Sequence, residues 1–124
     1  MTAPAKPVVG RLETVAVSGT DATETVVAKA DTGADRTTVD ETLLERIGST
    51  GAIDDVTVRS GGSAESRDIV AISVDVRSVD RGPRVVLADV DDRQPYTGDV
   101  LLGSDLLDGF YVDCELQNTT ANAD

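Results

Sequence analysis

The sequence contains no histidine, no tryptophan and a single cysteine, Cys114. Without histidine, neither a Ser-His nor a Cys-His nucleophilic pair can form, and a zinc site made of cysteine and histidine is excluded. One cysteine cannot form a disulfide bond within the chain, and we expect Cys114 to be a small buried hydrophobe near the end of the last strand. Catalysis would therefore have to use carboxylates, hydroxyls or a carboxylate-bound metal.

Aromatic residues are equally scarce, with one Phe and two Tyr in 124 residues. The core must be built from Val, Leu, Ala and Ile, which bury less area per side chain, so self-association would help stability. Residues 1–7 lack the apolar run of a signal peptide, and no stretch is long enough to span a bilayer. These features predict a cytoplasmic protein without a membrane partner.

Basic residues are few, with 11 Lys and Arg against 23 Asp and Glu and a formal net charge of −12. The acidic residues are spread along the chain, which indicates a solvated surface and not a disordered arm. Such a surface repels itself unless salt screens it. The pattern resembles that of cytoplasmic proteins from salt-in halophiles, and an ordinary acidic protein is the alternative. No basic stripe is present to neutralise phosphates, so we expect no nucleic-acid partner.

The length fits one domain, predicted at residues 8–117 between a flexible N-terminus at 1–7 and a flexible C-terminus at 118–124. Hydrophobic alternation and turn residues predict β-strands and two short helices. The strands are expected at residues 8–17, 23–30, 56–60, 69–79, 84–89, 100–102 and 111–116, and the helices at 40–47 and 104–108. Thr38 or Asp40 can cap the first helix and Gly48 can end it, while Ser104 can cap the second. The fold class is therefore all-β, a small closed barrel with two short helices.

One tripeptide, Asp31-Thr32-Gly33, stands directly after the β run at residues 25–30. In a chain so rich in Asp, Thr and Gly the tripeptide can arise by chance, and Asp31 could then be a turn residue that caps local amides. A second element gives it context, because residues 99–103 form an apolar run that ends in Gly103 and leads into the second helix. A motif with such context indicates a functional site.

Residues 28–35 resemble the active-site strand and loop of the retropepsin-like aspartic peptidases. The run Val100-Leu101-Leu102-Gly103 resembles the apolar-apolar-Gly strand that precedes the C-terminal helix of that family. The Ala-Lys-x-Asp-Thr-Gly-Ala start and the Leu-Leu-Gly-x-Asp end are most similar to a microbial, haloarchaeal-type family often labelled ATP-dependent zinc protease. The resemblance covers residues 8–113 and implies the small closed barrel of the acid proteases. The zinc in that label does not fit a chain without histidine, and we predict no metal and no cofactor.

The resemblance also implies roles for individual residues. Asp31 would be the catalytic carboxylate, and since the chain has one such motif, a homodimer would supply the second Asp31. Two facing carboxylates share one proton, so one member activates a water while the other protonates the peptide carbonyl. The remaining candidates support the loop, the second motif or a flap over the substrate: Thr32, Gly33, Ala34 and Asp35 in the loop, Leu101, Leu102 and Gly103 in the second strand, and Ser60, Gly61, Gly62, Ser63 and Arg67 in the flap.

Two features depart from the viral members of that family. Ser104 stands where they often carry an Arg that contacts the Asp at position 35, so Arg36 and Arg67 are candidates to replace that Arg. The flap tip at residues 59–65 is polar, which suits a polar or acidic substrate or no proteolysis at all. Asp54-Asp55 and Asp91-Asp92 could bind a hard cation, although a solvated surface is the simpler interpretation.

Three functional interpretations therefore stay open. The first is a homodimeric aspartic endopeptidase that hydrolyses peptide bonds. The second is a catalytically weak or inactive dimer of the same fold that binds a peptide or protein tail. The third is a monomeric all-β interaction domain in which the motif is accidental.

Overall fold

The computed structural model describes residues 6–119, which form eight β-strands and two short helices. In chain order the elements are β1 (Val8–Ser18), β2 (Thr23–Ala30), β3 (Thr38–Asp40), α1 (Glu41–Ile47), β4 (Asp54–Ser60), β5 (Ser63–Val76), β6 (Arg84–Asp91), β7 (Val100–Leu102), α2 (Ser104–Leu107) and β8 (Tyr111–Asn118). Residues 1–5 and 120–124, which belong to the two predicted flexible ends, lie outside the described residues. Strand β8 runs to Asn118, one residue past the predicted end of the domain.

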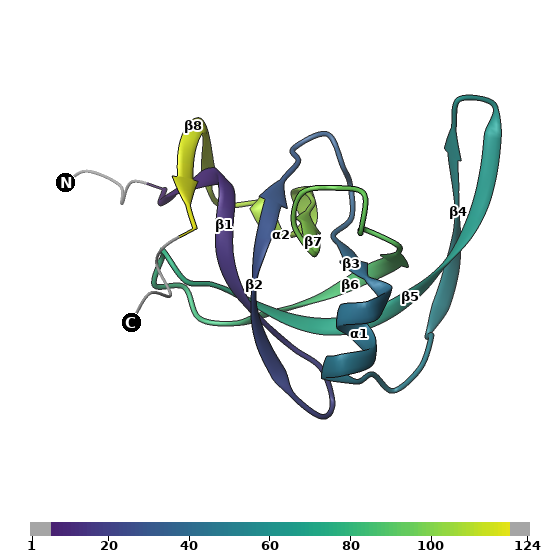
Figure 1. Ribbon diagram of the computed structural model, residues 1–124. Helices are drawn as coiled ribbons and strands as arrows, with labels where there is room; N and C mark the ends of the chain where they lie inside the picture. The colour runs from purple at the N-terminus through teal and green to yellow at the C-terminus, as the bar shows by residue number, and fades with distance from the viewer. Residues whose placement is uncertain (1–5, 120–124) are drawn as a thin grey trace.

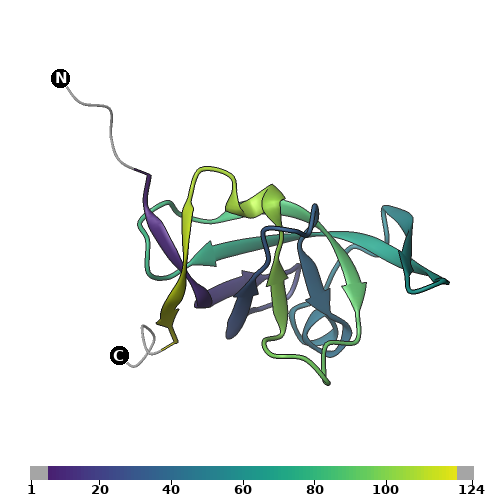
Figure 2. The same cartoon turned by 90° about the horizontal axis from the view of Figure 1, so that it is seen from above.

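The strands form one mixed sheet in the order β4-β5-β6-β3-β7-β2-β1-β8, and a further pairing of β5 with β1 closes it into a ring (Figure 1). β2 and β7 are parallel, as are β3 and β6, while β3 and β7 are antiparallel. This arrangement confirms the predicted all-β fold with two short helices. The β4–β5 hairpin projects from one side of the ring, and β8 lies on the opposite side, as Figure 2 shows.

The interior of the ring is aliphatic, as the composition requires. On β5 the buried Val70, Ile72, Val74 and Val76 alternate with more exposed residues, so one face of the strand packs inward. β1, β2, β3 and β7 add side chains to the same cluster, and α1 closes one end with Leu43 and Ile47. Burial of these side chains is the main stabilising term of the fold.

The buried carboxylate of Glu13 holds the β8 side of the ring together. It accepts hydrogen bonds from the Gly10 N–H, the Ser78 hydroxyl and the Asn118 side-chain amide. These donors come from β1, from the turn after β5 and from the end of β8. A carboxylate that is fully buried is tolerated because all three donors satisfy its oxygens.

The two helices begin in different ways. Asp40, the last residue of β3, caps α1 by accepting from the Thr42 and Leu43 N–H groups, and Gly48 at φ 82° ends the helix, both within the predicted options. The prediction that Ser104 caps α2 is wrong, because Gly103 occupies the N-cap position without a side-chain cap. Neither helix of the described chain is long and apolar enough to cross a membrane.

Three local predictions need correction. β3 was not predicted, because three residues directly before a helix give no periodic signal. β5 begins at Ser63 and not near residue 69, because five of its first six residues are polar and the segment shows no apolar alternation. Cys114 is exposed on β8 and not buried, since β8 lies at the end of the sheet order and exposes most of its side chains.

Candidate active site

Asp31 directly follows β2, at the point where the chain leaves the sheet. Its N–H donates to the Leu102 carbonyl at 2.9 Å, which continues the parallel pairing of β2 with β7 by one residue. Its carbonyl accepts from the Ala34 N–H at 3.1 Å, and its Oδ1 accepts from the Gly33 N–H at 3.0 Å. The carboxyl group of Asp31 is therefore fixed by its own turn, and the residue is partly exposed to solvent.

The second motif lies directly beside this turn. Leu102 is fully buried opposite Ala30, and Leu101 is half-buried opposite Lys29. Beyond them, the Ser104 N–H donates to the Ala34 carbonyl at 2.7 Å. Backbone hydrogen bonds to Leu102 and Ser104, which lie far along the sequence, thus hold the two ends of the Asp31 turn.

Two residues that local sequence patterns do not indicate as partners, Thr37 and Asp105, complete this connection. The Asp105 carboxylate accepts from the Thr37 N–H at 3.1 Å and from the Thr37 hydroxyl at 2.8 Å. The same hydroxyl oxygen accepts from the Gly103 N–H at 3.3 Å. Thr37 is fully buried, so these bonds replace water that it cannot reach. The Leu-Leu-Gly-x-Asp motif contained Asp105, but nothing local indicated its partner.

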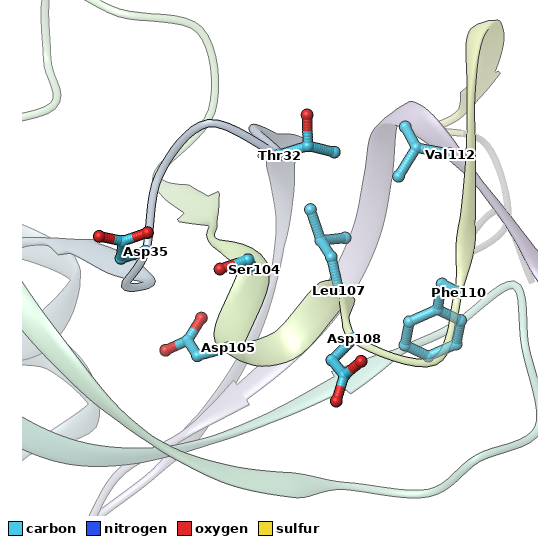
Figure 3. A pocket seen from close by; sticks show the side chains of 8 residues that line it. All are labelled: Thr32, Asp35, Ser104, Asp105, Leu107, Asp108, Phe110 and Val112. Carbon is cyan, nitrogen blue, oxygen red and sulfur yellow. The ribbon is translucent and has the colours of Figure 1, made fainter.

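Thr32 is exposed and borders a cavity of about 450 Å³ next to α2 (Figure 3). Asp35 lies further along the same loop, at the side of the cavity where Ser104 and Asp105 lie. The apolar part of the lining comes from Leu107, Phe110 and Val112. This cavity therefore joins the loop after Asp31 to α2 and to the beginning of β8.

A second cavity, of about 440 Å³, lies between the β4–β5 hairpin and the same loop. From the loop it is lined by Ala34, Asp35 and Arg36, and from β7 by Leu101. The hairpin contributes Thr57, Val58 and Arg67, and the remaining lining residues are Thr38, Asp89, Asp91, Arg93 and Tyr96. Asp31 itself lines neither of these two cavities.

Arg67 is the most connected cation of the second cavity. Its Nη2 lies 3.1 Å from Asp91 Oδ2, its Nη1 lies 3.8 Å from Asp89 Oδ1, and its Nε lies 2.8 Å from Glu65 Oε1. Arg67 therefore does not replace the arginine missing at position 104, since its ion pairs are not with Asp35. Arg36 does not replace it either, because neither Arg36 nor Asp35 forms an ion pair within residues 6–119.

Asp89 is a buried carboxyl group in the lining of this cavity. Burial raises its pKa above the ordinary value, while the hydrogen bond from the Thr38 hydroxyl and the positive charges of Arg67 and Arg36 oppose the rise. Asp91, which was expected at a solvated surface, is half-buried and paired with Arg67, whereas Asp92 and the Asp54-Asp55 pair are exposed. Within the described chain no group of three or more acidic, Cys or His side chains could hold a metal ion.

The predicted flap residues form the end of the β4–β5 hairpin. Ser60 and Ser63 are paired across the turn, and Gly61 and Gly62 have φ values of 58° and 85°. Two consecutive residues with positive φ are typical of a type I′ turn, which favours glycine. Among the flap candidates whose side chains the structure describes, Arg67 lines the second cavity, whereas Gly61, Gly62 and Ser63 do not.

Comparisons with known proteins agree with this geometry. Residues 6–106 match a family model described as "Aspartyl protease". A Legionella pneumophila protein of unknown function has a similar structure, with a TM-score of 0.61 and 17% identity over 94% of this chain and 99% of that one. The protease of simian foamy virus (mac) has a TM-score of 0.51 and 23% identity over 77% of this chain and 90% of its own. No curated protein matches the chain.

Proposed function

Since the chain belongs to the aspartyl protease family, we propose that it is a homodimeric aspartic endopeptidase that uses Asp31 from each of two chains. The observation that carries the proposal is the position of Asp31 at the end of β2. There the turn bonds to Gly33 and Ala34, together with the backbone bond to Leu102, fix a partly exposed carboxylate. Each chain contains one Asp-Thr-Gly motif, so the second carboxylate must come from another copy.

The chemistry requires both carboxylates. Two such groups in contact cannot both be ionised, so the pair shares one proton. The ionised member removes a proton from a water molecule, whose oxygen attacks the peptide carbonyl carbon, while the protonated member donates its proton to the carbonyl oxygen. Collapse of the tetrahedral intermediate breaks the C–N bond, and the leaving amine takes a proton from the pair.

The surface around Thr32 supports a two-fold arrangement. Thr32 is exposed next to Asp31 and borders the first cavity, whose apolar lining is Leu107, Phe110 and Val112. A two-fold axis beside Asp31 would bring both copies of this surface together, which is the self-complementary contact typical of homodimers. Burial of the apolar lining by the partner would add stability that the aliphatic core of one chain lacks.

The test compares the wild type with Asp31→Asn in molar potassium chloride, using a library of peptides derived from a proteome. We expect the wild type to cleave peptides, a statine-containing inhibitor to block cleavage, and Asp31→Asn to lower turnover by about a thousandfold or more. The control is Asp80→Asn, an exposed carboxylate in the turn after β5, which should leave turnover unchanged. Equal behaviour of the wild type and Asp31→Asn at acid and neutral pH would refute the enzymatic proposal.

A dimer that binds a peptide or protein tail without cleaving it is the second candidate. The polar end of the hairpin favours it, because Gly61, Gly62, Ser63 and Glu65 are exposed and the only apolar side chain at positions 61–65 is the methyl group of Ala64. This candidate predicts that the same peptide library yields bound peptides but no products. It also predicts that Asp31→Asn binds them as well as the wild type.

A further inference from the structure

The outer part of the β4–β5 hairpin has little to hold it in place. β4 stands at the end of the sheet order, and among the described strands its ladder partner is β5. The residues at positions 61–66 are all exposed, as is Arg59 on the opposite arm. Figure 1 shows this part of the hairpin extending away from the ring. The position of this outer part must therefore be determined by contacts at the base of the hairpin, where it joins the rest of the protein.

Arg67 lies at that meeting point. The pairing of β5 with β6 reaches only as far as Ile69 opposite Asp89, so two residues further out β5 has left β6. There the Arg67 side chain spans the separation and reaches Asp91 at 3.1 Å and Asp89 at 3.8 Å, both on β6. On the neighbouring arm, Val56 is the register partner of Arg67. One guanidinium thus connects the base of the hairpin to β6 where backbone pairing has ended.

One of the two acceptors on β6, Asp89, is itself held in place. Asp89 is 6% exposed and accepts the Thr38 hydroxyl of β3. Thr37, the preceding residue, donates to Asp105 and accepts from the Gly103 N–H, which are the bonds that hold the loop after Asp31. Through Asp89, Arg67 is therefore connected to the residues that hold the loop after Asp31.

The third partner of Arg67, Glu65, does not connect the hairpin to another element. Glu65 lies on the hairpin itself, and its side chain is 57% exposed. An ion pair within one strand cannot tie that strand to another element, and exposed pairs contribute little. The contacts with Asp89 and Asp91 are thus the ones that fix the hairpin relative to the cavity.

We propose that Arg67 is a positioning residue that anchors the base of the β4–β5 hairpin to Asp89 and Asp91. The hairpin then bends outward from Arg67, and the anchor sets where Thr57 and Val58 lie across the second cavity from Ala34 and Asp35. The part of this inference that concerns a reacting peptide rests on the proposed function. The anchoring itself does not, because it follows from the ion pairs of one chain.

Hydrogen exchange of the full-length protein, followed by mass spectrometry, tests the anchoring without any assay of activity. Arg67→Met keeps the aliphatic length of the side chain but removes the charge, and we expect exchange in residues 55–68 to become about tenfold faster while β1 and β2 stay unchanged. Arg59→Met is the matched control, since it removes an exposed arginine of the same hairpin that has no ion pair among the described residues. Glu65→Gln should also leave exchange unchanged.

A second variant tests the same anchoring if Arg67→Met does not fold. Asp91→Asn removes the closest acceptor on β6 but leaves Arg67 in place, so exchange in the hairpin should rise in the same direction by a smaller factor. Equal exchange in the wild type, Asp91→Asn and every Arg67→Met sample that folds would overturn the anchoring, as would an equal rise in Arg59→Met.

Kinetics on the best-cleaved peptide then test the positioning role. A misplaced hairpin should raise KM by about tenfold and change kcat by less than about threefold, because the Asp31 pair is untouched. Arg67→Lys keeps one positive charge and should restore most of the lost KM. A fall in kcat alone, or a lysine variant no better than methionine, would refute this role. A protein whose hairpin responds in exchange but which cleaves nothing would refute the proposed function and leave the anchoring intact.

Discussion

The backbone of Arg36 occupies the space in which any residue other than glycine at position 103 would place its Cβ atom. A Cβ at Gly103 would lie 2.5 Å from the Arg36 carbonyl carbon, 2.6 Å from its oxygen and 2.9 Å from its nitrogen. These atoms are backbone and cannot move as the end of a flexible side chain can. The second motif and the Asp31 loop are therefore in direct backbone contact.

This contact predicts the effect of Gly103→Ala. The added methyl group must push the loop away from β7, and overpacking of this kind costs about 1 to 3 kcal/mol. Denaturant titration in molar salt measures the loss in the free energy of unfolding. The neighbouring exposed Ser104→Ala should change it by less than about 0.5 kcal/mol. A Gly103→Ala protein as stable as the wild type would show that the loop can shift freely.

A second prediction concerns Thr37→Val, which keeps the shape of a fully buried side chain but removes its hydroxyl. The Gly103 N–H then loses its acceptor and Asp105 loses one of its two donors from Thr37. An unsatisfied buried group costs about 1 to 3 kcal/mol, so the free energy of unfolding should fall by this amount. The exposed Thr50→Val is the control for the same chemical change. If the two variants were equally stable, the Thr37–Asp105 contact would not be holding the loop.

A third prediction tests the proposed dimer through Thr32→Arg. Two guanidinium groups facing each other beside the two-fold axis would repel each other and would not fit against the apolar lining of the first cavity. Light scattering in molar salt should report the mass of one chain for this variant and of two chains for the wild type. Thr50→Arg adds the same charge at another exposed threonine and should stay dimeric. A wild type that is strictly monomeric would argue against both the enzymatic and the tail-binding proposals.

The raised pKa of Asp89 gives a fourth prediction, on pH. Because burial raises the pKa of the folded state above that of the unfolded chain, the folded protein holds a proton that the unfolded chain has already lost. Ionised Asp89 therefore lowers stability above its folded pKa, and this loss is relieved as the pH falls through that value. Asp89→Asn has no such titration. The free energy of unfolding of the wild type, relative to Asp89→Asn, should rise between neutral pH and about pH 4. Denaturant titrations at several pH values measure it, and a pH-independent difference would contradict the assignment.

The sequence alone determined the features that arise from neighbouring residues. The alternation on β5, the Asp40 and Gly48 ends of α1 and the two positive-φ glycines of the hairpin depend on local backbone and side-chain chemistry. The two motifs could be recognised for the same reason, since each is a short run of contiguous residues. The resemblance to a known family then supplied the architecture that local patterns leave open, and the closed ring of strands agrees with it.

Only the tertiary structure decided which distant residues meet. Thr37 and Asp105 are 68 positions apart, and Arg67 meets Asp91 because β5 and β6 diverge just beyond Ile69. Neither contact leaves a periodic trace in the sequence, because each depends on the register and twist of strands paired far along the chain. The same holds for Cys114, whose exposure follows from the place of β8 at the end of the sheet and not from its apolar character. The local sequence thus predicted Asp31 and its turn. Long-range packing determined which residues hold that turn and which residues anchor the hairpin beside it.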